Sequence, residues 1–299
     1  MTFQRSLLPL ILLVSGAVGL HAVDKQIPTE PHARVSFVPE SAFYRPDRPI
    51  QLALTFKIQS GWHTYWTNPG TAGEAARVDW DLPKGWKDLG LRFPVPGRFT
   101  EEDVVVFGYE NAVTLLDTLL PPPEAGAGPV RLTAHVSWLA CSNVCVGEQK
   151  TVALSLRPGP SGPVPELFQE AEKGIPVDET GLRATLRRSW WGGWVLESPL
   201  PHGFEGTGTC RFIPENSLGV DFSKDLLGEI HGKKVRFNLS IRRNLLDRGR
   251  VEGIIQPISD RGGWRVSAAP EDSTQWLWVL PILLLSGWVM KDILKGLKK

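Results

Sequence analysis

Residues 137–148 of this 299-residue chain read Ser137-Trp138-Leu139-Ala140-Cys141-Ser142-Asn143-Val144-Cys145-Val146-Gly147-Glu148. The stretch holds two of the chain's three cysteines, between two runs whose patterns predict β-strands. An extended strand places residues i and i+4 about 13 Å apart, whereas a disulfide requires Cα atoms within roughly 7 Å. If the two cysteines bond, the backbone between them must turn, and Ser142-Asn143 favours a turn.

A bridge between Cys141 and Cys145 would close a very short loop. Such a loop stabilises a fold by about 2 kcal/mol, against about 4 to 5 kcal/mol for a very long loop. A bridge that only braced the fold would gain more by joining distant strands, and strained or exposed bridges are the labile ones. The spacing therefore favours a redox-active pair. A structural bridge that pins a hairpin and a metal-binding pair remain as alternatives.

The sequence around this pair predicts an all-β protein. Residues 50–58 alternate between apolar and polar side chains with the period of a strand. Further strands are predicted at 35–38, 62–66, 77–82, 104–108, 113–119, 130–138 and 151–156. Short strands separated by frequent turns predict an immunoglobulin-like antiparallel sandwich over 34–157. A Pro/Gly-rich linker with one short helix is expected at 158–179, and a second, smaller β-sandwich-like domain at 180–270.

The two ends of the chain predict export and a membrane anchor. Residues 1–22 are typical of a signal peptide, with an uncleaved anchor as the alternative. Residues 276–294 predict one C-terminal transmembrane helix, with a buried or interfacial helix as the alternative. The lysines after this segment would lie in the cytoplasm, which places both β domains at the periplasmic face of the inner membrane. The net charge of +1 gives no support to nucleic-acid binding.

Four motifs in order carry a family resemblance. They are Gly61–Gly70 (GWHTYWTNPG), Phe93–Phe99 (FPVPGRF), Phe107–Glu110 (FGYE) and Trp138–Cys145 (WLACSNVC). Together they resemble the N-terminal periplasmic domain of the thiol:disulfide interchange protein DsbD. The three-residue cysteine spacing is closer to the ScsB-like branch than to DsbD itself, whose spacing is wider. The resemblance covers about residues 34 to 157 and extends loosely over the second domain.

This resemblance implies an immunoglobulin-like redox module that is a component of a protein-disulfide reductase. Cys141 and Cys145 would be the exchanging thiols, and analogy with the family favours Cys145 as the attacking one. The pair would accept electrons from a thioredoxin-like or transmembrane thiol donor and reduce periplasmic disulfide proteins. Because the chain shows a single predicted span without a cysteine, we expect a separate transmembrane electron donor. No cofactor is expected.

The resemblance also indicates supporting residues. His63 and Tyr65 match an aromatic i, i+2 pair that faces the cysteines, and a positive charge on His63 would favour a thiolate. Phe99 and Phe107 match the aromatic side chain of a loop that shields the pair. Glu148 is a candidate for proton handling. The plain alternatives are a hydrogen-bonded histidine on the sheet surface, two core phenylalanines and a solvated turn glutamate.

Two other functions remain open. One is a membrane-tethered binding or assembly module with a structural disulfide. The other is a copper-handling protein that uses Cys141 and Cys145 with His63 or His135, since thiolates suit Cu(I). The third cysteine, Cys210, lies on a β-pattern and is expected to be a buried small hydrophobe, with a reactive or intermolecular thiol as the alternative.

Overall fold

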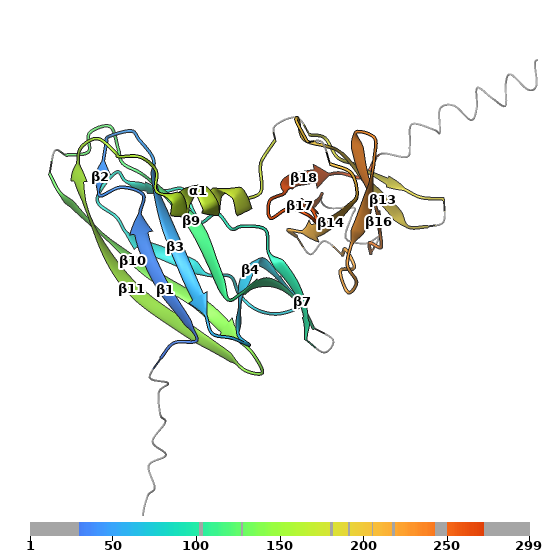
Figure 1. The fold of residues 1–299 in the computed structure, drawn as a ribbon, viewed down its shortest axis with the longest axis horizontal. Coiled ribbons are helices and arrows are strands. Elements are labelled where there is room, and N and C mark those ends of the chain that lie inside the picture. Colours follow the sequence, from blue (N-terminus) through green and yellow to red (C-terminus); the bar gives the residue numbers. More distant parts are fainter. Residues whose placement is uncertain are drawn as a thin grey trace, which may run out of the picture. The chain divides into compact units, whose positions relative to one another are not determined.

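The computed structural model describes residues 30–101, 104–126, 128–179, 182–190, 192–204, 206–216, 219–242 and 250–271 (Figure 1). Within these ranges the chain forms three β-sheets and one α-helix. The predicted signal peptide at 1–22 lies outside the described residues.

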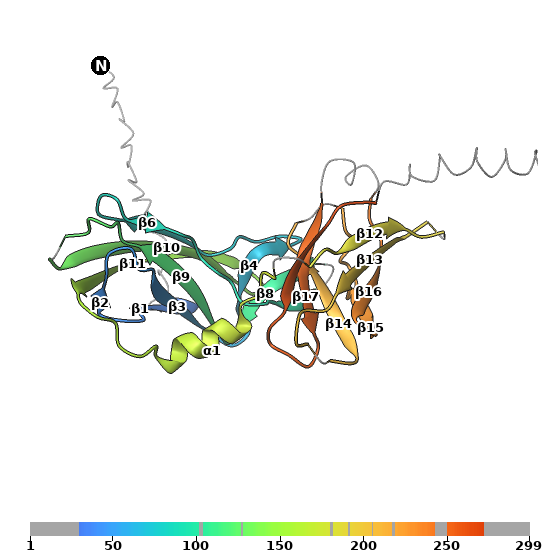
Figure 2. The same ribbon diagram turned by 90° about the horizontal axis from the view of Figure 1, so that it is seen from above.

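The first two sheets form the sandwich that the sequence predicts. One sheet has the order β1 (Ala33–Pro39), β3 (Ile50–Ile58), β9 (Ala112–Leu120), β6 (Lys87–Asp88). The other has the order β2 (Phe43–Tyr44), β11 (Cys145–Pro158), β10 (Val130–Cys141), β4 (His63–Gly70), β8 (Val104–Glu110), β7 (Gly97–Glu101), and β5 (Arg77–Asp81) also pairs with β10. Figures 1 and 2 show β1 and β3 lying against β10 and β11 as two layers. Between the layers, Phe56 packs edge-on against Trp138 with ring centroids 5.5 Å apart.

The β10–β11 hairpin carries the cysteine pair. Its antiparallel register runs without a break from Val130↔Leu156 to Cys141↔Cys145. Side chains alternate between the two faces of a strand, so the even-numbered residues of β10 point inward and the odd-numbered ones outward. Burial follows this rule along most of the strand, with Trp138 buried and Ser137 exposed. The register therefore places Cys141, Cys145 and their odd-numbered neighbours on the outward face.

The opposite edge of β10 has two partner strands in succession. β5 pairs with it from Thr133 to Ser137, and β4 pairs with it at Cys141. Among the described residues, no strand pairs with this edge between those two positions. The second sheet consequently has a local gap just before the cysteine.

The third sheet contains the remaining strands. Its order is β12 (Thr185–Arg188), β13 (Trp194–Pro199), β16 (Lys234–Leu239), β15 (Leu227–His231), β14 (Thr209–Pro214), β17 (Val251–Pro257), β18 (Trp264–Ala268). Leu186 forms a parallel bridge with Pro270, and Glu271 N donates to Leu186 O at 2.8 Å. Because this bridge joins the two ends of the strand order, the sheet curves around its own core. That core includes Phe237 and Trp264.

One helix lies in the chain between the sandwich and the third sheet, where the sequence predicts a linker with a short helix. α1 spans Glu166–Gly174 and buries Phe168 against Ala53 and Leu116. Nine residues of helix rise only about 14 Å, well short of the ~30 Å hydrocarbon core of a membrane.

The predicted C-terminal transmembrane helix requires a correction. In the part of the chain that the structure describes, no helix is long and apolar enough to cross a membrane. The predicted span at 276–294 lies outside the described residues. The fold is therefore all-β with an immunoglobulin-like sandwich, a third curved sheet and one short helix, and the structure gives no support to a single-span anchor.

A buried carboxylate in the first sheet predicts a pH-dependent stability. Asp117 is fully buried, and burial, reinforced by the nearby Asp88, raises its pKa from 3.8 to about 6 against the opposing hydrogen bond from Trp80 Nε1. Well below pH 3.8 the Asp117 carboxyl group is protonated in both the folded and the unfolded chain. Burying it then carries no cost of burying a charge, and the protein has its full stability. As pH rises from 3.8 to 6 the unfolded chain releases its proton first, and about 3 kcal/mol is lost.

We expect an Asp117→Asn variant to lose this part of the pH dependence. The measurement is denaturant unfolding of both proteins between pH 4 and pH 7, with the difference between them as the readout, because other carboxyl groups titrate equally in both. An unchanged difference across that range would contradict the assignment.

Candidate functional site

The two cysteines form a disulfide at the tip of the β10–β11 hairpin. Their Cα atoms lie 4.1 Å apart, and the S–S distance is 2.09 Å. The chain turns between them, where Ser142 N donates to Val144 O at 3.0 Å. A turn at this place was expected, because an extended chain would hold the two cysteines too far apart to bond.

The two sulfur-bearing residues differ in exposure. Cys141 is 1% exposed and lies in a small cluster with Tyr65 and Val106, with Phe99 and Leu139 packed against it. Cys145 is an exposed residue. The bridge is therefore open to solvent at Cys145, whereas Cys141 is shielded by its neighbours.

His63 and Tyr65 lie beside the bridge. β4 meets β10 at the pair His63↔Cys141, and strand alternation puts Tyr65 on the same face as His63. Tyr65 Oη lies 3.2 Å from His63 Nε2 and 3.8 Å from Cys145 Sγ. Both side chains are buried. The three residues form a chain of polar contacts that ends at the exposed cysteine.

The structure separates the two phenylalanines. Phe99 on β7 packs against the cluster of Cys141, and its ring centroid lies 6.3 Å from that of His63. Phe107 on β8 is 2% exposed and packs in the sandwich core, with its centroid 6.5 Å from that of Trp66. Phe99 is thus at the site, and Phe107 is on the other face of its sheet.

Glu148 lies on the inward face, away from the disulfide. Its carboxylate accepts hydrogen bonds from His32 N at 2.6 Å, Ala33 N at 3.1 Å and Trp138 Nε1 at 2.8 Å. His32 Nδ1 lies 2.9 Å from the same carboxylate, whose side chain is only 9% exposed. Glu148 is therefore neither a solvated turn residue nor a neighbour of the sulfurs. It fastens the start of β1 to the hairpin.

Two further residues lie away from the pair. His135 is six residues before Cys141 on β10, a separation of about 20 Å along a strand. Its ring contacts Asp81 and Thr151. Cys210 is completely buried on β14, and burial raises the pKa of its thiol to about 11. In the described part of the chain, no group of three or more His, Cys, Asp or Glu side chains is arranged to hold a metal ion.

The sequence interpretation missed apolar neighbours of Cys141, among them Leu139 and Val106. Leu139 precedes it by two residues on the same face, and Val106 lies on β8. The period-two pattern would have indicated Leu139, whereas Val106 reaches the site only through the pairing of β8 with β4.

Comparisons with known proteins give a family match and a similar solved fold. The family model for the N-terminal part of the thiol:disulfide interchange protein DsbD matches residues 34–156. The crystal structure of the N-terminal periplasmic domain of ScsB from Proteus mirabilis is 18% identical, with a TM-score of 0.55, over 81% of this chain and 94% of that chain. At this identity the likeness shows the fold alone.

Two matches to solved chaperone structures have much lower TM-scores. The periplasmic chaperone SfaE is 8% identical over 79% of this chain and 100% of its own, and the E. coli chaperone DraB is 10% identical over 79% and 97%. Both have a TM-score of 0.23, which is too low to carry an argument. No curated protein matches the chain.

Proposed function

Because residues 34–156 match the family model for the N-terminal part of DsbD, we propose that this chain passes reducing equivalents from a thiol donor to the disulfides of partner proteins. The observation that carries the proposal is the bridge between a shielded Cys141 and an exposed Cys145 at the tip of a hairpin. A closed disulfide fits an oxidising compartment, and the similar ScsB domain is described as periplasmic. We therefore place this module in the periplasm.

The exchange proceeds through two mixed disulfides. A donor thiolate attacks the Cys145 sulfur, Cys141 leaves as a thiolate, and a second donor thiol then releases Cys145. The module now holds two thiols, and the donor holds a disulfide. Cys145 next attacks a partner disulfide, and Cys141 resolves the mixed disulfide and restores the bridge. Two electrons and two protons pass from donor to partner in each cycle.

Tyr65 and His63 have a role in the reduced state. The Tyr65 hydroxyl is placed to donate a hydrogen bond to a Cys145 thiolate, because Oη lies 3.8 Å from Sγ in the bridged form. His63 can donate from Nε2 to the same hydroxyl oxygen, 3.2 Å away. Phe99 packs against the cluster that holds Cys141 from the side of β7 and helps to shield that cysteine. The donor is a separate thioredoxin-like or transmembrane dithiol protein, and the acceptors are periplasmic disulfide proteins.

The reduction potential of the Cys141–Cys145 pair tests this function. We expect a value between about −120 and −270 mV, the range of exchange catalysts, from equilibration with glutathione and dithiothreitol buffers. A Tyr65→Phe variant should be about 30 mV more negative, since it loses a hydrogen bond of about 1.4 kcal/mol to the thiolate. A value well below about −300 mV would instead identify a structural bridge.

A matched control is available for the tyrosine. Tyr109→Phe also removes one buried hydroxyl, but that hydroxyl donates to Pro94 O at 2.7 Å and belongs to the sandwich core. Its potential should equal that of the wild type. Equal potentials for the Tyr65→Phe variant and the wild type would remove Tyr65 from the mechanism.

A further inference from the structure

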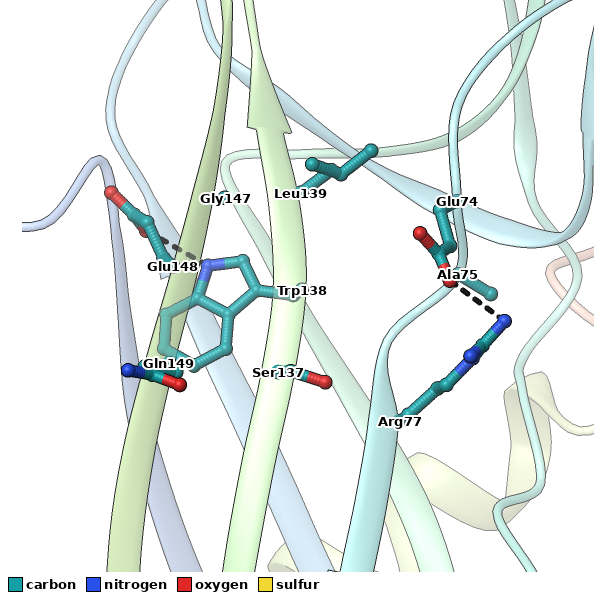
Figure 3. A pocket seen from close by; sticks show the side chains of 9 residues that line it. All are labelled: Glu74, Ala75, Arg77, Ser137, Trp138, Leu139, Gly147, Glu148 and Gln149. Atoms are coloured by element: carbon teal, nitrogen blue, oxygen red, sulfur yellow. Dashed lines mark hydrogen bonds and ion pairs between the residues drawn. The ribbon is translucent and has the colours of Figure 1, made fainter.

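A hollow of about 330 Å³ lies next to the disulfide, on the hairpin and the segment before β5 (Figure 3). Leu139 and Gly147 face each other across the hairpin, and Ser137 and Gln149 form the next outward pair. Glu74, Ala75 and Arg77 line the other side, as Figure 3 shows. The lining is thus apolar near the cysteines and polar further along β10.

Two features of the chain create this hollow. The edge of β10 has no partner strand between Ser137, which pairs with β5, and Cys141, which pairs with β4, among the residues that the structure describes. In addition, Gly147 contributes no side chain on the outward face. The missing strand and the missing side chain leave space directly beside Leu139.

The hollow and the disulfide lie on the same, outward face of the β10–β11 hairpin. The pair Leu139↔Gly147 follows Cys141↔Cys145 by two residues, with one inward-facing pair between them. Residues two apart on a strand lie about 7 Å apart and share a face. An extended partner segment bonded through its cysteine to Cys145 has the same spacing, so its residue two positions from that cysteine reaches Gly147.

The rim suits a polypeptide. Glu74 and Arg77 form an ion pair at 2.7 Å, yet their side chains remain 53% and 70% exposed. Ser137 and Gln149 add neutral hydrogen-bonding groups. Apolar contact is available from Leu139 and Ala75, so an aliphatic side chain can be buried while the flanking peptide groups stay solvated.

We propose that this hollow binds the residue two positions from the reacting cysteine of a partner polypeptide, and that it selects an aliphatic side chain there. The proposal rests on the thiol–disulfide exchange proposed above and adds a recognition site to it. Exchange chemistry sets which bond is broken, whereas the hollow sets which partner reacts fast.

A Gly147→Phe variant tests the proposal because the position accepts a side chain. A Cβ at residue 147 would meet only Leu139 Cδ2, at 3.9 Å, which is an ordinary van der Waals contact. The ring would then fill the hollow without displacing the backbone. Ala153→Phe is the matched control, since Ala153 is exposed on the same face of β11, three outward positions further along.

The probes are two synthetic peptides that each carry one cysteine as a mixed disulfide with thionitrobenzoate. They differ only in having leucine or glycine two residues from the cysteine on both sides. The reduced protein attacks the peptide sulfur through Cys145 and expels thionitrobenzoate, which is followed by absorbance. Cys141 then closes the bridge and releases the peptide thiol, so the protein loses two electrons and the probe disulfide gains them.

We expect the wild type and Ala153→Phe to react about tenfold faster with the leucine peptide, as partial burial of a leucine predicts. Gly147→Phe should react equally with both peptides and retain the wild-type rate with the small disulfide dithiobis(nitrobenzoate). Equal rates for both peptides in the wild type, or a preference that survives in Gly147→Phe, would overturn the recognition site alone. Failure of the wild type to react with any of the three probes would overturn the exchange function as well.

Discussion

A Cys145→Ser variant loses exchange activity by about a thousandfold or more, while Cys141→Ser accumulates a stable mixed disulfide with its partner. Loss of an attacking group reduces catalysis by several orders of magnitude. The exposed Cys145 can attack in the absence of Cys141, but no second thiol then resolves the product. With Cys145 absent, the remaining thiol is 1% exposed behind Tyr65 and Val106 and does not reach a partner disulfide.

Thionitrobenzoate release and mass spectrometry of the trapped species measure both effects. Cys210→Ser is the control, and it should retain full activity because Cys210 is completely buried and its thiol pKa is raised to about 11. A mixed disulfide that forms on Cys141 in the Cys145→Ser variant would reverse the assigned order of attack. If the double Cys141→Ser, Cys145→Ser variant still passes electrons to an acceptor, the exchange function is wrong.

Glu148→Ala should have the largest effect on stability. The carboxylate accepts hydrogen bonds from His32 N, Ala33 N and Trp138 Nε1, and its side chain is 9% exposed. Its removal leaves these donors without an acceptor at the junction of β1 and the hairpin. Each charged hydrogen bond contributes about 1.5 to 3 kcal/mol, so we expect a loss on the order of 3 to 5 kcal/mol in the free energy of unfolding.

Urea unfolding of the oxidised protein measures this loss. Glu229→Ala provides the comparison, because that side chain is 76% exposed and its removal should change stability by less than about 0.5 kcal/mol. The proposed exchange function leads to a second expectation for Glu148→Ala. A loosened hairpin should also raise the rate at which dithiothreitol reduces the bridge. A loss below about 1 kcal/mol would show that water replaces the carboxylate adequately.

Local patterns predicted much of the sandwich. The alternation of residues 50–58 gives β3 in full, and the predicted runs 130–138 and 151–156 give parts of β10 and β11, which extend to the two cysteines. These strands follow from period-two burial, which is a property of neighbouring residues. β12 (TLRR) and β15 (LGEIH) escaped prediction because neither run alternates clearly between apolar and polar side chains.

Long-range contacts explain what the sequence did not reveal at the site. Glu148 follows the turn and resembles a solvated residue, but its partner His32 is 116 residues away. Phe99 and Phe107 are both strand aromatics, and only the β7–β8 register, which pairs Arg98 with Phe107, assigns them to opposite faces. The hollow depends on where β4 and β5 end along β10, which no local pattern records.

The unbroken ladder of the β10–β11 hairpin has a consequence for the working cycle. Opening the Cys141–Cys145 bridge frees a loop so short that it changes the unfolding free energy by only about 2 kcal/mol. The pairs from Val130↔Leu156 to Ala140↔Val146 remain, and Trp138 stays buried. Oxidation state and folding are therefore coupled by only about 2 kcal/mol in this hairpin. The module can be reduced and reoxidised repeatedly while presenting the same surface to every partner.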